Sequence, residues 1–265
     1  MSLKQWLNRT LSKNKARENT GSVVSTLMWA AHVKLEQKDF GEARRLLLQA
    51  LERRDEIVDA TQVYYIITSL GVAWLFEEEY VACIEFFSEY IRRYPGDAAA
   101  YCARGGALWY SGRLTEALAD HSRALEISPN DVGALLERGQ ILAETGEHNK
   151  ALDDLALALQ LIPHGEIQDA TWLRKMEAYA RNGRGLALGG IGELELAFRE
   201  FESSIALCPD NAWVYFNRAL VNDRLGDLKK ANSDYQSALT RNDPKLNPLR
   251  RKFAEGRMQE LRAQQ

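Results

Sequence analysis

The stretch that decides the fold reads AAAYCARGGALWYSGRLTEALADHSRALEISPND and covers residues 98–131. Apolar side chains recur in it every three or four residues, first as far as Tyr110 and again from Leu114, which is the spacing of two amphipathic helices. Gly112 lies between the two runs, where it predicts a tight turn, and Pro129 ends the second run. Residues 98–131 therefore predict a helical hairpin.

Residues characteristic of this hairpin, above all its closing proline, recur along the chain at a fixed period. Pro95, Pro129 and Pro163 are each 34 residues apart, and Pro209 follows after 46, which is 34 plus 12. A fixed period of paired helices predicts hairpins that stack on one another and bury a shared core. The six predicted repeats are 24–57, 64–97, 98–131, 132–165, 178–211 and 212–245.

Two inserts interrupt this period. One of 6 residues precedes the second repeat, and one of 12 residues precedes the fifth. Both inserts share the phrase Glu-Ile-x-Asp-Ala-Thr, which lies at residues 56–61 and again at 166–171. We expect each insert to extend the following helix at its N-terminal end, the second by about one turn more than the first.

The pattern resembles the tetratricopeptide repeat (TPR) family, a helix–turn–helix repeat of 34 residues. The marks are clearest in the third repeat, at Tyr101, Gly105, Leu108, Leu114, Ala117, Ala124, Leu125 and Pro129. The resemblance covers residues 24–245, although the first repeat has Ala31 in place of the glycine and Asp55 in place of the proline. It implies an all-α right-handed superhelix whose concave face is lined by the first helix of each repeat. It also implies protein binding in general.

Positions 7 and 23 of the repeats change together. The first two repeats have apolar pairs, Ala30 with Leu46 and Leu70 with Phe86, whereas the other four have arginine with a carboxylate. Because the two positions face each other across the turn, we predict bidentate ion pairs that fix the first helix against the second. The alternative is a row of charged ligands for an anionic partner. The predicted pairs are Arg104–Asp120, Arg138–Asp154, Arg184–Glu200 and Arg218–Asp234.

A second stripe of the first helices, at positions 2, 5, 9, 12 and 13, is rich in aromatic residues and poor in charge. Such a composition is typical of a binding surface, so we predict a groove that takes a peptide or helix of a partner protein. The alternative is that part of this stripe packs against the neighbouring first helix. The predicted groove residues are Tyr65, Phe76, Trp109, Tyr110, Tyr179, Trp213 and Phe216.

The two ends of the chain lie outside the repeats. Residues 1–23 carry Leu3, Trp6 and Leu11 on one helical face among basic residues, which predicts an amphipathic basic helix or arm. This helix either packs on the repeats, lies in the groove, or docks on a partner or a membrane surface. Residues 246–265 are predicted to form a C-terminal capping helix, because a repeat stack needs a solvated end.

Composition and motifs exclude several functions. The 34 Lys and Arg residues against 37 Asp and Glu give a net charge of −3 over 265 residues, so nucleic acid is not expected as a partner. The chain contains no Walker A, GxSxG or HExxH motif, and its four histidines fall at scattered repeat positions, so we expect no enzyme, cofactor or metal. The three cysteines form no CxxC pair, and the N-terminus has no secretory signal, which favours the cytoplasm.

These features together predict a cytoplasmic, non-enzymatic adaptor or scaffold that binds another protein in an aromatic concave groove. Two alternatives stay open. One is a specific inhibitor or immunity-type protein that masks an enzyme with an acidic surface. The other is a membrane-associated assembly factor that docks through the basic N-terminal helix.

Overall fold

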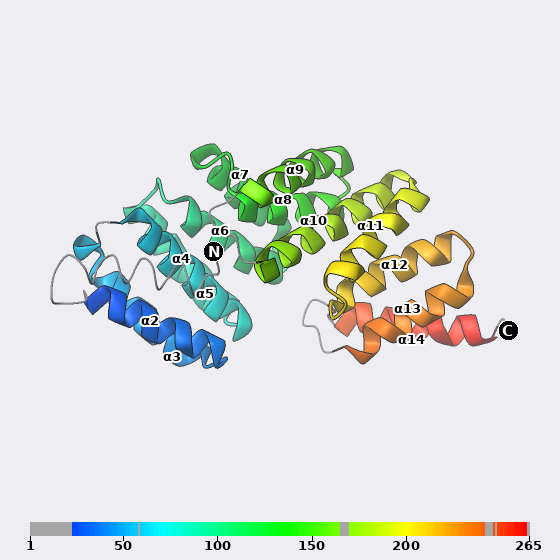
Figure 1. The fold of residues 1–265 in the computed structure, drawn as a ribbon, viewed down its shortest axis with the longest axis horizontal. Helices are drawn as coiled ribbons and strands as arrows, with labels where there is room; N and C mark the ends of the chain where they lie inside the picture. Colours follow the sequence, from blue (N-terminus) through cyan, green and yellow to red (C-terminus); the bar gives the residue numbers. More distant parts are fainter. Residues whose placement is uncertain (1–22, 58, 165–169, 242–245, 247, 264–265) are drawn as a thin grey trace. The chain divides into compact units, whose positions relative to one another are not determined.

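The computed structural model describes residues 23–263 except 58, 165–169, 242–245 and 247. All regular elements within these residues are helices, which confirms the predicted all-α solenoid class (Figure 1). The predicted N-terminal helix over residues 1–23 lies outside the described part of the chain, apart from its last residue. The α-helices are α2 (Val23–Glu36), α3 (Phe40–Glu52), α4 (Ala60–Phe76), α5 (Tyr80–Arg93), α6 (Ala98–Tyr110), α7 (Leu114–Ile127), α8 (Val132–Glu144), α9 (His148–Leu161), α10 (Ala170–Ile191), α11 (Leu194–Leu207), α12 (Ala212–Arg224), α13 (Leu228–Thr240) and α14 (Pro248–Ala263).

Consecutive helices pair as hairpins, for example α6 with α7 and α12 with α13. Short 3₁₀ turns follow α3 (Arg54–Glu56) and α9 (Ile162–His164). The two inserts lengthen the helices that follow them, as predicted. α4 begins four residues before its predicted repeat and α10 begins eight before its own, which makes α10 the longest of the described helices at 22 residues.

The chain divides into two compact units, and the division falls inside α8 after Arg138. Unit 1 (residues up to Arg138) contains α2 to α7 and buries Met28, Leu47, Ile66 and Phe87 in one continuous apolar core. α4 packs against α6 as well as against its neighbours in sequence, so the first helices of adjacent repeats lie side by side. Unit 1 is therefore held together by the apolar faces of its hairpins.

Unit 2 (residues from Gly139 onward) contains α9 to α14. Phe201, Val214 and Val221 form one buried cluster. A second cluster contains Tyr235 of α13 together with Met258 and Leu261 of α14, so the last helix packs on α13 through its apolar face. The C-terminal helix thus supplies part of the core of unit 2.

Small residues let the two helices of a hairpin approach closely. A Cβ atom added to Gly105 would lie 2.8 Å from the imidazole of His121, which is fully buried. Burial first, and the charge of Arg138 second, lower the pKa of His121 to about 3. The histidine is therefore neutral near pH 7 and serves as a packing residue.

Candidate protein-binding surfaces

Three of the four arginine–carboxylate pairs at positions 7 and 23 are present within the two units. Arg104 donates to Asp120 through Nε and Nη2 at 2.7 Å each, and Arg218 donates to Asp234 through the same two atoms at 2.8 and 2.7 Å. Arg184 forms a single contact of 3.1 Å with Glu200. These guanidinium groups are bound to carboxylates of their own hairpin, which supports a structural role over anion binding.

The residues of the fourth predicted pair belong to different units, since Arg138 lies in unit 1 and Asp154 in unit 2. Within unit 1, Arg138 Nη1 donates to Ser122 Oγ at 3.4 Å. The corresponding bond in the third repeat is donated by Arg104 Nη1 to Ser88 Oγ at 3.1 Å. Both arginines therefore contact the second helix of the preceding repeat.

Three of the seven predicted groove residues are core residues, and the prediction that they face a partner is wrong. Trp213 is only 1% exposed, and Tyr65 and Phe216 are also buried. In α12 the cause is α14, because Arg250 lies over the ring of Trp213 and Phe253 meets Phe216 edge to face. Tyr65 belongs to the core cluster of unit 1, where burial raises the pKa of its hydroxyl to about 12. These positions pack inside the stack.

Two of the predicted groove residues, both in unit 1, are exposed. Phe76 is 62% exposed and Tyr110 is 37% exposed. Each stacks on a ring at the start of the preceding second helix: Phe76 on Phe40 at 4.8 Å between centroids, and Tyr110 on Tyr80 at 6.0 Å. Trp109 is half-buried, with its ring 5.6 Å from that of Tyr110. We call these five residues the aromatic edge.

Sequence reasoning missed Phe40 and Tyr80, although a signal for them exists. Both occupy position 17 of their repeats, and the rings that they contact occupy position 13 of the next repeat. Comparing position 17 of one repeat with position 13 of the following one would have paired Phe40 with Phe76 and Tyr80 with Tyr110. The prediction compared positions only within a repeat or along one stripe.

Charged side chains border the aromatic edge. Arg44 of α3 forms ion pairs with Glu77 and Glu79, which follow Phe76 in the turn between α4 and α5. The Arg44–Glu79 contact measures 2.7 Å. A polar rim beside exposed aromatic rings is the usual anatomy of a protein interface.

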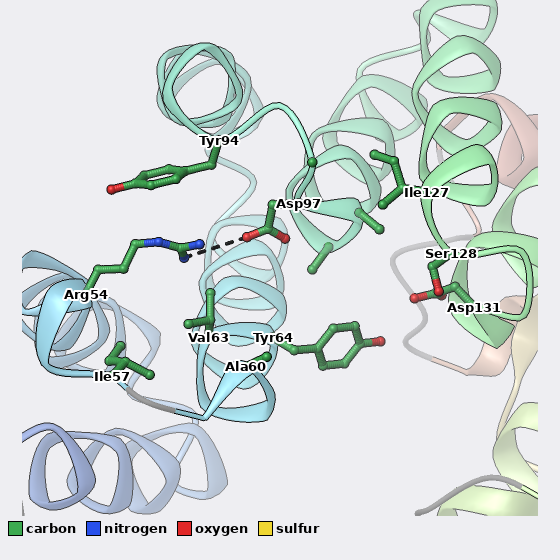
Figure 2. A pocket seen from close by; sticks show the side chains of 13 residues that line it. Arg54, Ile57, Ala60, Val63, Tyr64, Tyr94, Asp97, Ile127, Ser128 and Asp131 are labelled. Atoms are coloured by element: carbon green, nitrogen blue, oxygen red, sulfur yellow. Dashed lines mark ion pairs between the residues drawn. The ribbon is translucent and has the colours of Figure 1, made fainter.

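A separate cavity of about 600 Å³ opens in unit 1 where second helices connect to first helices. Figure 2 shows Tyr64 pointing from α4 toward Ser128 and Asp131, with Arg54 and Tyr94 on the other side of the cavity. None of these residues was predicted as a site. The lining residues are Arg54, Ile57, Ala60, Val63, Tyr64, Tyr94, Gly96, Asp97, Ala98, Ala99, Ile127, Ser128 and Asp131.

Unit 2 has a corresponding cavity of about 480 Å³ beside the extended N-terminal part of α10. Tyr179, the one predicted groove residue not yet placed, lines this cavity together with Arg174 and Lys175. Cys208 lies opposite, and burial raises the pKa of its thiol. A neutral thiol is a weak nucleophile, so the arrangement does not favour cysteine chemistry.

The described residues offer little for catalysis. Burial raises the pKa of the Cys102 thiol well above its ordinary value. Within the described ranges, no three His, Cys, Asp or Glu side chains come together as ligands for a metal ion. In the same part of the chain, the helices are all too short or too polar to span a bilayer.

Comparison with known proteins agrees with this architecture. A family model described as tetratricopeptide repeat matches residues 84–132 and 102–166. A chain of the APC/C hetero-tetramer Cut9–Hcn1 superposes with a TM-score of 0.73 and 16% identity over 98% of this chain, which spans only 46% of that chain. A tetratricopeptide repeat protein of Parabacteroides merdae gives a TM-score of 0.56 and 18% identity, covering 92% of this chain and 93% of that one.

A thermophilic TPR protein of Thermus thermophilus also matches, with a TM-score of 0.53 and 17% identity over 75% of this chain and 98% of that one. A comparison with curated proteins found no match. The hairpins and the matches together define a helical-repeat scaffold. The family model over residues 84–166 and the fold support a tetratricopeptide-repeat protein, a class that generally serves protein–protein interaction.

Proposed function

We propose that this protein is a non-enzymatic scaffold that binds an apolar peptide or helix of a partner protein on the aromatic edge of unit 1. The observation that carries the proposal is the pair of exposed rings, Phe76 and Tyr110, presented in the same way by two successive repeats. Partner side chains that cover them would bury apolar surface that is now in contact with water.

The stacked arrangement favours binding in a second way. Each exposed ring is held against a partner ring, Phe40 or Tyr80, so its orientation is fixed before a partner arrives. Side chains that are ordered in advance lose little conformational entropy on binding. Covering the exposed part of Phe76 alone is worth about 1–2 kcal/mol at ordinary transfer energies.

The test uses peptides selected by display on the immobilised full chain. The affinity of a selected peptide is then measured by calorimetry for the wild type and for the double variant Phe76→Ser/Tyr110→Ser. We expect the double variant to bind at least tenfold more weakly, because both exposed rings are removed. The far-ultraviolet circular dichroism should stay unchanged.

The matched control is Ile191→Ser/Leu196→Ser, because these side chains are 47% and 46% exposed and belong to unit 2, so they are not part of the aromatic edge. This control should bind the peptide like the wild type. If the control loses as much affinity as the Phe76/Tyr110 variant, or if that variant binds normally, the aromatic edge is not the binding surface.

A further inference from the structure

One wall of the cavity of unit 1 comes from the end of the first repeat, which supplies Arg54 and Ile57, and from the first insert, which supplies Ala60 and Val63. The chain leaves α3 through the 3₁₀ turn that contains Arg54 and continues through Ile57 before α4 begins at Ala60. These residues form one wall of the cavity. The opposite wall comes from the loops before α6 and α8, which carry Asp97 and Asp131. The cavity therefore lies between the connection from α3 to α4 on one side and the loops before α6 and α8 on the other.

At one end of the cavity, the positive charge of Arg54 is paired with the carboxylate of Asp97. Arg54 donates to the hydroxyl of Tyr90, which in turn donates to Asp97 Oδ2 at 3.0 Å. The guanidinium carbon lies 4.1 Å from the centre of the Tyr94 ring, and Nη1 lies 3.8 Å from Asp97 Oδ2. Arg54 thus contacts two aromatic rings and is paired with a carboxylate, so we treat it as part of the cavity lining and not as a ligand-binding charge.

The other end of the cavity is negative. Asp131 Oδ1 accepts a hydrogen bond of 2.9 Å from the backbone N–H of Ala134 and so caps α8. Among the residues that the structure describes, no basic side chain forms an ion pair with Asp131. Tyr64 points toward it (Figure 2). Tyr64 as a whole is 48% exposed, whereas desolvation of its hydroxyl and next the negative charge of Asp131 raise the pKa of that hydroxyl.

The floor between the two ends is apolar. Ala60, Val63, Ala98, Ala99 and Ile127 line it, and none of them offers a polar side-chain atom. A ligand that satisfies both regions needs an aliphatic stem to cover this floor and a cationic head to reach Asp131. Lysine and arginine side chains combine these two properties.

We propose that the cavity binds a lysine or arginine side chain of a partner protein, with the cationic head between Asp131 and the ring of Tyr64. The volume of about 600 Å³ also leaves room for the backbone that carries this side chain. The inference rests on the proposed function only in that the partner is a protein. The cavity and the aromatic edge share no residue, so each can fail alone.

The test uses small probes and isoleucine methyl groups. Ile57 and Ile127 line the cavity and Ile191 of unit 2 does not, so their methyl signals report on binding and on non-specific effects. The full chain is titrated with N-acetyl-lysine amide and N-acetyl-arginine amide. We expect saturable shifts of Ile57 and Ile127 with both, and none of Ile191.

Two matched probes and one variant separate charge from shape. N-acetyl-norleucine amide has the stem without the charge, and N-acetyl-glutamate amide has the opposite charge; neither should saturate the signals. Asp131→Asn keeps a side chain that can cap α8 but removes the charge, and should weaken binding of the lysine probe at least fivefold.

Three results would overturn the assignment. Equal shifts with norleucine would mean an apolar cavity without charge selection. Saturation by glutamate alone would make Arg54 the anchor for an anion. Unchanged affinity of Asp131→Asn for the lysine probe would remove Asp131 from the site. The Phe76/Tyr110 experiment would stand in each case, because it concerns a different surface.

Discussion

Position 15 of the repeats takes a left-handed backbone conformation in all six turns between paired helices. Four of these turns use glycine, with φ between 79° and 95°. In the first two repeats the same position is occupied by Lys38 with φ 60° and by Glu78 with φ 57°. The sequence alone predicts the turn from glycine where glycine is present. The structure adds that the turn persists without it, at a cost to residues that carry a Cβ atom.

We therefore expect Glu78→Gly to stabilise unit 1 by about 0.5–1 kcal/mol. Relief of the strained conformation is worth about 1–2 kcal/mol, and the greater freedom of glycine in the unfolded chain removes part of this gain. Urea unfolding of the two proteins gives the difference. Gly112→Ala, which puts a Cβ atom at φ 82°, is the opposite control and should destabilise. A Glu78→Gly variant less stable than the wild type would refute the argument.

The helices of a hairpin are held together in two alternative ways. The second repeat uses the apolar pair Leu70 and Phe86, whereas the third uses Arg104 and the buried Asp120. Breaking a buried ion pair from one side leaves an uncompensated charge, whereas replacing the whole pair by apolar residues is often neutral. The two repeats thus offer a comparison within one chain.

Arg104→Leu alone should destabilise the protein by about 3–5 kcal/mol, because Asp120 then stays buried without its partner. The double variant Arg104→Leu/Asp120→Phe copies the second repeat and should recover most of this loss. Breaking the exposed Arg113–Glu116 pair by Arg113→Leu is the control and should cost far less, because water screens an exposed ion pair. Chemical unfolding measures all three. If the double variant is as unstable as the single one, an apolar pair cannot replace the ion pair in the third repeat, and the argument is wrong.

The sequence predicts the helices well because helical periodicity, turn glycines and inserts are local signals. It fails for Trp213 and Phe216, because the face that could bind a partner is also the face that packs on the next helix. Only the three-dimensional arrangement tells which neighbour covers it. The cavity beside Tyr64 was missed for a related reason: its walls come from separate loops that no single motif connects.

The proposed binding surfaces belong to one of the two units. Both proposed surfaces are built from residues of unit 1. Unit 2 ends with α14, where Met258 and Leu261 are buried and Arg257 holds Asp223 through two bonds of 2.6 and 2.7 Å. Disturbing α14 should therefore affect the stability of unit 2 and leave binding by unit 1 intact.

Leu261→Asp tests this division, because it puts a charge in the core beneath α14, where an unpaired carboxylate costs several kcal/mol. Hydrogen exchange should show loss of protection in α12 and α13, with α4 to α6 unchanged. The affinity of a display-selected peptide should stay within about twofold of the wild type. Leu249→Asp, at an exposed position of the same helix, is the control and should change neither measurement. If peptide affinity falls together with the protection of α12, the binding surface extends beyond unit 1. The reason is that Leu261 belongs to unit 2, so its substitution changes no residue of a site built only from unit 1.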